Sequence, residues 1–179
     1  EMPEIPSSPA DPKSPDDLPK SPDDLPKYDN VLNEDFGFLG SAIIFNFVKF
    51  PPRRDGSSRD RLGSNEDVNL LKSLLTRARI KYDVKTDVKT KEDMMEALSD
   101  FAENEDHKLG CMAFIYILSH GDIDENGMFI STSDGGKVYL EKDVYPFFYH
   151  DKCPNLVGKP KNFVIVSCRG EKKQEGNST

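Results

Sequence analysis

Cys111-Met-Ala-Phe-Ile-Tyr-Ile-Leu-Ser-His-Gly-Asp122 is the stretch that decides the fold, because its first part, up to Leu118, is the most apolar run in the chain. An apolar run of this length predicts a buried strand. Its polar end, Ser119 to Asp122, then lies just past the carboxyl end of that strand, where open α/β sheets gather their functional groups.

Further segments predict strands beside it: Ser41 to Phe47, Ile80 to Val84 and Asn162 to Ser167. The first is apolar enough to be buried on both faces. Met128 to Ser131 and Lys137 to Tyr139 flank Asp134-Gly-Gly136 and predict a small hairpin.

Two amphipathic helices are expected between the strands. Ser64 can cap the first, with Asp67 three residues later, and Thr90 with Asp93 repeats this arrangement for the second. The expected apolar residues are Leu70, Leu71, Leu74 and Leu75 in the first helix, and Met94, Met95, Leu98 and Phe101 in the second. Glu141 to Phe148 predicts a short helix. Strands that alternate with helices predict an α/β fold with a largely parallel sheet.

The first 27 residues differ from the rest, since they hold eight of the 13 prolines and a tandem repeat, Ser14 to Lys20 and Ser21 to Lys27. So few apolar side chains cannot offset the entropy of ordering, which predicts a disordered tail at 1–27 and a folded domain at 28–179. One interpretation of the tail is a segment that binds a partner. The other is a solvating spacer or the remnant of a removed leader.

Composition narrows the classes of function. The formal net charge is −8 and the basic residues form no long stripe, so we expect protein or peptide partners and no nucleic acid. No apolar run is long enough to cross a bilayer, which predicts a cytoplasmic protein without membrane contact. The three cysteines, an odd number, argue against a disulfide framework and leave a free thiol.

Reactive side chains follow two of the predicted strands. His120 follows the strand predicted from Cys111 to Leu118, and Cys168 follows the strand predicted from Asn162 to Ser167. If these strands are neighbours, a thiol and an imidazole share one cleft and form a nucleophile and general-base pair. The backbone amides of Gly121 and Cys168 are then candidates for an oxyanion hole. The alternative is that the cysteine is a small buried hydrophobe and the histidine a structural residue.

Other constellations are weaker. His150 and Cys153 have a spacing that zinc ligands use, but no second pair stands nearby, and a surface loop is the better interpretation. Asp122, Asp124 and Glu125 lack the full spacing of a calcium loop and predict a solvated turn. We therefore expect no metal and no cofactor.

The spacing of the reactive pair is informative, because His120 precedes Cys168 by 48 residues. A histidine about 50 residues before a Gln-Ala-Cys-[Arg/Gln/Gly]-Gly element is a signature of caspases. The element here is Val166-Ser-Cys-Arg-Gly170. Across Tyr28 to Gly170 the chain resembles the large subunit of a caspase.

The resemblance implies a three-layer αβα caspase-like fold, of which this chain is the large-subunit portion only. Ser119-His120-Gly121 matches the family's catalytic histidine and oxyanion glycine. The segment Arg61-Leu-Gly-Ser64-Asn-Glu-Asp67 resembles an Arg-x-Gly-Thr-x-x-Asp element whose arginine binds the substrate's aspartate at P1, the residue on the acyl side of the cleaved bond. Arg61 is therefore the P1-binding candidate, and a guanidinium suits a carboxylate because it binds both oxygens.

Two departures from the family stand out. Val166 occupies the place of a glutamine that helps hold the P1 aspartate, and losing that hydrogen bond costs roughly 1.5–3 kcal/mol, or about 10- to 100-fold in binding or rate. The chain also stops at Thr179. We therefore expect a partner, the family's small subunit, in a homodimer or heterodimer of large and small pairs.

Two functions are expected. The first is a cysteine endopeptidase, made as a zymogen, that cleaves proteins after aspartate in apoptosis or related signalling. The second is a catalytically weak caspase-like regulator that binds an active caspase or its inhibitors. Val166 favours the regulator, whereas the presence of both His120 and Cys168 favours the protease.

Overall fold

The computed structural model describes residues 38–167, which all belong to one of the chain's two compact units. The predicted tail and the boundary at Tyr28 lie outside the described residues. None of the helices within 38–167 has both the length and the apolar character that a membrane span requires.

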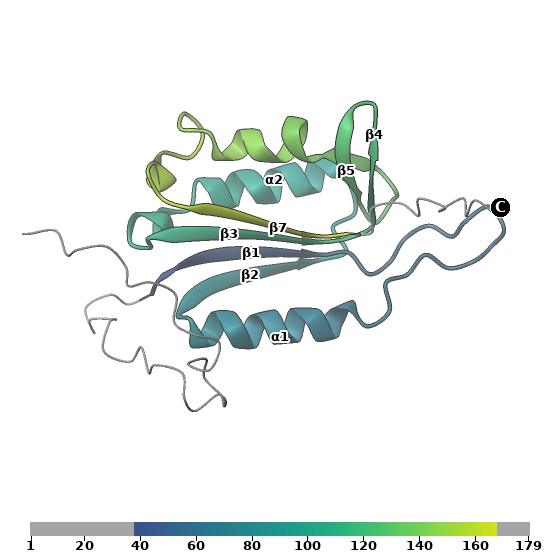
Figure 1. Cartoon of the computed structure of the whole chain (residues 1–179), viewed down its shortest axis with the longest axis horizontal. Helices are drawn as coiled ribbons and strands as arrows, with labels where there is room; N and C mark the ends of the chain where they lie inside the picture. Colours follow the sequence, from purple (N-terminus) through teal and green to yellow (C-terminus); the bar gives the residue numbers. More distant parts are fainter. Residues whose placement is uncertain (1–37, 168–179) are drawn as a thin grey trace, which may run out of the picture. The chain divides into compact units, whose positions relative to one another are not determined.

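A four-stranded parallel sheet forms the centre of the described region (Figure 1). Its strands are β1 (Gly40–Asn46), β2 (Ile80–Thr86), β3 (Met112–Leu118) and β7 (Lys161–Val166), in the order β2-β1-β3-β7. Every pairing is parallel. The predicted fold class, α/β with a largely parallel sheet, is confirmed. The strand that precedes His120, β3, pairs directly with β7, the strand that precedes Ser167.

Strand β1 is buried along its whole length, as its composition predicts. Ile43 and Phe45 pack into the core on one face of the sheet, whereas Ala42 and Ile44 pack into the core on the other. This alternation follows from the two-residue period of a strand. Helices must therefore cover both faces.

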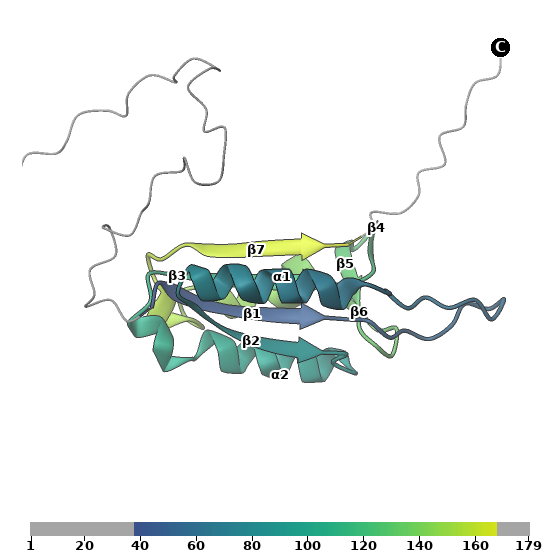
Figure 2. The same ribbon diagram turned by 90° about the horizontal axis from the view of Figure 1, so that it is seen from below.

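Helix α1 (Ser64–Arg77) covers one face, as Figure 2 shows. Two details of its prediction are wrong. Gly63, in a left-handed conformation with φ 89°, is the N-cap, and Ser64 is already helical and makes no capping bond. Leu70 and Leu74 are exposed, and the buried side of the helix is formed instead by Val68, Leu71 and Leu75, which recur at the helical period.

Helix α2 (Lys91–Ala102) covers the opposite face and begins as predicted. The Thr90 hydroxyl accepts a hydrogen bond from the Asp93 amide, and the Asp93 carboxylate accepts one from the Thr90 amide. Two of its own side chains, Met94 and Leu98, are fully buried. The reciprocal bonds fix where the helix starts.

Short helices complete this second layer: η4 (Glu105–Lys108), η5 (Leu140–Val144), η6 (Tyr145–Phe148) and η7 (Pro154–Leu156). The predicted helix at 141–148 is thus divided, with a π-helical turn followed by a 3-10 turn. Pro146 in η6 has no amide hydrogen to extend the first turn.

A small antiparallel sheet stands at the carboxyl end of the parallel one (Figure 1). It contains β4 (Gly121–Asp124), β5 (Gly127–Ser131) and β6 (Lys137–Tyr139). The β5–β6 hairpin is confirmed. The predicted solvated turn is present at the exposed Glu125 and Asn126, directly after Asp124. The Asp124 carboxylate accepts hydrogen bonds from Lys137 at 2.7 Å and from the Tyr139 hydroxyl at 3.1 Å, and these contacts tie β4 to β6.

His107, in η4, is a buried titratable group of the second layer. Its Nε2 lies 2.6 Å from the Phe101 carbonyl oxygen, and because that oxygen only accepts, the ring donates there. Burial lowers the pKa of His107, and the neighbouring Lys159 ammonium lowers it further, against the opposing effects of the Phe101 carbonyl and the Asp106 carboxylate. Folding therefore favours the neutral form of this imidazole.

We expect the free energy of unfolding to fall as the pH decreases below about 6.5, the ordinary pKa of histidine. The unfolded chain binds a proton there that folded His107 does not, so this group's contribution is complete above that pH and is lost below it. Urea unfolding of the wild type and His107→Gln between pH 7.5 and 5.5 tests this. The variant should lose the dependence, the exposed His150→Gln control should keep it, and equal slopes in wild type and His107→Gln would contradict the assignment.

Candidate active site

A cleft of about 700 Å³ opens at the carboxyl ends of β1, β3 and β7. Its walls come from the loop after β1, the first turn of α1 and the residues that follow β3 and β7. It is lined by Asp60, Arg61, Leu62, Gly63, Ser64, Asp67, Ser119, His120, Val166 and Ser167. Three predicted site residues, Arg61, His120 and Val166, therefore share one cleft.

The backbone around His120 is fixed by both sheets. The Ser119 amide donates to the Val166 carbonyl at 3.1 Å, and the Ser131 amide donates to the His120 carbonyl at 2.9 Å. The buried Ser119 hydroxyl also donates to the Ser131 carbonyl at 2.6 Å. The end of β3 is thus held between β7 and β5.

The imidazole of His120 has a defined tautomer. Its Nε2 lies 2.6 Å from the Arg59 carbonyl oxygen, which can only accept, so Nε2 carries the hydrogen and Nδ1 of the neutral ring keeps its lone pair. The Phe50 ring packs against the imidazole, with ring centroids 4.6 Å apart. The Arg59 guanidinium lies 5.8 Å from the centroid of the Phe50 ring. The imidazole is therefore oriented by a hydrogen bond and by packing.

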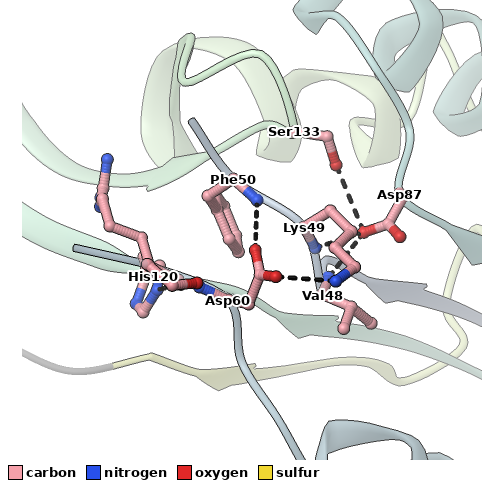
Figure 3. A network of polar contacts seen from close by, with 9 residues as sticks. Val48, Lys49, Phe50, Asp60, Asp87, His120 and Ser133 are labelled. Atoms are coloured by element: carbon pink, nitrogen blue, oxygen red, sulfur yellow. Dashed lines mark hydrogen bonds and ion pairs between the residues drawn. The ribbon is translucent and has the colours of Figure 1, made fainter. Parts of the chain in front are cut away.

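Two carboxylates hold the loop that supplies these contacts (Figure 3). Asp60 accepts from the Lys49 ammonium at 2.7 Å and from the Phe50 amide at 3.2 Å. Asp87 accepts from the Val48 amide at 2.6 Å and from the Lys49 amide at 2.9 Å. The hydrogen bond from Lys49 keeps the pKa of Asp60 below its usual value.

Arg61 is anchored to the chain just past β1. Its Nη1 donates to the Phe47 carbonyl at 3.0 Å, and its amide donates to the Val48 carbonyl at 2.8 Å. The exposed turn with Arg53 and Arg54 projects beyond these anchors. Arg61 thus belongs to the wall of the cleft.

Gly121 lies where no side chain fits. A Cβ at this position would stand 2.6 Å from the Phe129 carbonyl oxygen and 3.0 Å from the Ser167 hydroxyl. The close approach of β4 to β5 and to the end of β7 requires glycine there, quite apart from any oxyanion role.

The predicted nucleophile, Cys168, lies outside the described residues, directly after Ser167. The other cysteines are placed. Cys153 is buried, its thiol donates to the Ala102 carbonyl at 3.3 Å, and burial raises its pKa. Cys111 is exposed and precedes β3, whereas His120 follows that strand. Neither thiol lines the cleft.

Metal-ligating groups of three or more His, Cys, Asp or Glu side chains do not occur within residues 38–167. The cleft chemistry that these residues support is acid–base and electrostatic: an imidazole, a guanidinium and hydroxyl groups line the same cavity.

Comparison with known proteins now adds the decisive observation. The family model described as a caspase domain matches residues 39–179. The chain belongs to the caspase family. It is 36% identical over 153 residues to caspase-3 of Oryctolagus cuniculus, which covers 84% of this chain and 51% of that protein. It is 35% identical over 140 residues to caspase-9 of Homo sapiens, covering 76% of this chain and 32% of that protein.

The fold agrees with this assignment. The crystal structure of the Drosophila initiator caspase Dronc matches with a TM-score of 0.64 at 21% identity, over 70% of this chain and 47% of that one. This confirms the predicted caspase-like fold. The chain spans about half the length of caspase-3, the first of these relatives.

Sequence reasoning missed the groups that orient His120. The Arg59 acceptor is a backbone carbonyl, which leaves no mark in a sequence. A weak signal existed for Asp87, because it follows β2 directly and has φ 50°, a conformation that aspartate tolerates better than most residues.

We expect Asp87→Ala to lower the free energy of unfolding by about 2 kcal/mol, because two backbone amides lose a charged acceptor. It should also speed trypsin cleavage after Arg53 or Arg54, since the loop is released. Urea unfolding and timed proteolysis measure the two effects. Asp83→Ala is the matched control, since this exposed residue of β2 only pairs with Lys85, and it should change stability by about 0.5 kcal/mol or less. Equal effects of the two variants would refute the role of the Asp87 carboxylate in holding the loop after β1.

Proposed function

We propose that this chain is the catalytic large-subunit portion of a cysteine endopeptidase that cleaves proteins after aspartate. The observation that supports it best is the cleft itself. His120, with a lone pair on Nδ1, shares the cleft with Ser167, the residue directly before Cys168. The family relatives support a caspase-like protease.

The first half of the proposed reaction makes a thioester. Nδ1 of His120 takes the proton of the Cys168 thiol, and the thiolate attacks the carbonyl carbon of the substrate. The carbonyl oxygen becomes negative and accepts hydrogen bonds from the amides of Gly121 and Cys168. The imidazolium then gives its proton to the departing amine, and the carbon–nitrogen bond breaks.

The second half releases the product. His120 takes a proton from water, and the resulting hydroxide attacks the thioester carbon. The carbon–sulfur bond breaks, and the sulfur leaves as a thiolate that recovers its proton from the imidazolium. Throughout, the Arg59 carbonyl accepts from Nε2 and stabilises the charged ring.

Specificity for aspartate is assigned to Arg61. Its guanidinium stays charged when desolvated, and its anchor on the Phe47 carbonyl reduces the side-chain entropy lost on binding. Val166 lines the same cleft with an exposed apolar side chain and contributes no polar atom.

The second candidate function is a weakly active regulator of caspases or of their inhibitors. Val166 is the observation that favours it, because a cleft with one P1 donor fewer binds the aspartate less tightly. In either role we propose that the protein is cytoplasmic, is made as a zymogen and acts in apoptosis or related signalling.

Peptide cleavage by the full-length protein separates the two functions. We expect the wild type to cleave peptides with aspartate at P1, and Cys168→Ala to lose about 10³-fold or more of kcat/KM. Cys111→Ala is the matched control and should keep the activity, because this thiol lies outside the cleft. An inert wild type that Val166→Gln activates would establish the regulator in place of the protease.

The partner we propose is the family's small subunit. Strand β7 is an edge of the described parallel sheet, and beside it lies an apolar groove of about 490 Å³ on the α1 face. The groove includes Leu70, Leu74 and Val164, all exposed. An open edge with an apolar flank is a surface that another strand and helix would cover.

We expect Leu70→Asp together with Leu74→Asp to weaken association of the two processed chains of the full-length protein by about 30-fold or more. Analytical ultracentrifugation measures this. Leu109→Asp changes an exposed leucine of the turn before β3 and should leave association unchanged. Tight association of the double variant would remove this surface as the interface.

A further inference from the structure

Ser64 has a buried hydroxyl without a hydrogen-bond partner. The residue is only 4% exposed, and its Oγ makes no hydrogen bond within residues 38–167. It lines the cleft together with Arg61 and His120. A buried hydroxyl gives up its bonds to water, so a group without a protein partner is poised for a ligand.

The position of Ser64 suits a negatively charged ligand. It is the first residue of α1, a helix of 14 residues, and the N-cap Gly63 has no side chain to satisfy the first turn. The backbone amides at such a helix end carry a partial positive charge. The hydroxyl adds a donor to this end of the cleft, three residues from the guanidinium-bearing Arg61.

Two carboxylates also line the cleft, and neither removes this preference. Asp60 is neutralised by the Lys49 ammonium at 2.7 Å. Asp67 lies one turn further along α1 and lines the apolar groove as well as the cleft, so it stands at their common boundary.

We propose that the Ser64 hydroxyl donates a hydrogen bond to the P1 aspartate carboxylate and so determines specificity together with Arg61. This inference rests on the proposed protease function. It also accounts for Val166: the donor that the valine side chain lacks comes from the start of α1, which lines the same cleft.

Ser41 shows why location matters in this argument. It too is 4% exposed, with an unpartnered Oγ, yet it is the second residue of β1 and stands at the amino end of the sheet, away from the cleft. Ser41→Ala therefore removes the same atom from the same degree of burial and is the matched control.

The test compares kcat/KM of the full-length protein on two peptides that differ only in aspartate or asparagine at P1. Ser64→Ala should lower the rate for aspartate by about 10- to 100-fold, and the rate for neutral asparagine much less. Ser41→Ala should leave the ratio of the two rates unchanged. Adding Val166→Gln to Ser64→Ala should restore the ratio, whereas in the wild type it should change the ratio little.

The proposal is overturned if Ser64→Ala keeps the ratio, or lowers both rates equally without rescue by Val166→Gln, because the serine would then serve only the helix. Binding keeps this result separate from the proposed function. In the Cys168→Ala background, calorimetry with the same two peptides should show an aspartate preference that Ser64→Ala removes. A wild type without turnover but with this preference refutes the protease and keeps Ser64 as the carboxylate donor.

Discussion

The parallel register of β1 with both of its neighbours is the constraint on which the site depends. Asn46, the last residue of β1, lies opposite Thr86 of β2 on one side and Leu118 of β3 on the other, and Leu118 in turn lies opposite Val166 of β7. The strands therefore end together. Because β1 is buried on both faces, a shift by one residue would exchange its two apolar sets between the cores, and the register is strongly specified.

The loop after β1 converts this shared edge into a cleft. It carries the Arg59 carbonyl to the imidazole, the Phe50 ring against it and the Arg61 guanidinium to the wall. Asp60 and Asp87 fasten the loop to itself and to the end of β2. The orientation of His120 thus derives from segments far apart in the sequence, which hydrogen bonds between carboxylates and backbone amides hold in place.

Much of this architecture could be predicted from the sequence, and the failures have physical causes. The buried strands could be predicted because a strand that is covered on both faces needs apolar residues throughout. The Thr90 cap could be predicted because its partner, Asp93, is only three residues away. Ser64 fails as a cap because Gly63 takes the left-handed position before it. Leu70 and Leu74 look like core residues, yet a stripe of leucines does not say which of them faces the sheet. At the site, the sequence places His120 and Cys168 after predicted strands, but the pairing of those strands is seen only in the structure, and a carbonyl acceptor has no sequence signal.

That acceptor has an evolutionary consequence. The oxygen that orients His120 belongs to the main chain at position 59, so all twenty amino acids present it equally. The identity of the side chain there is free to drift without disturbing the imidazole. The position of the oxygen depends instead on the number of residues between Asn46 and this carbonyl, since an insertion or deletion would displace it. At position 59, the length of the loop therefore matters more for this hydrogen bond than the side chain does.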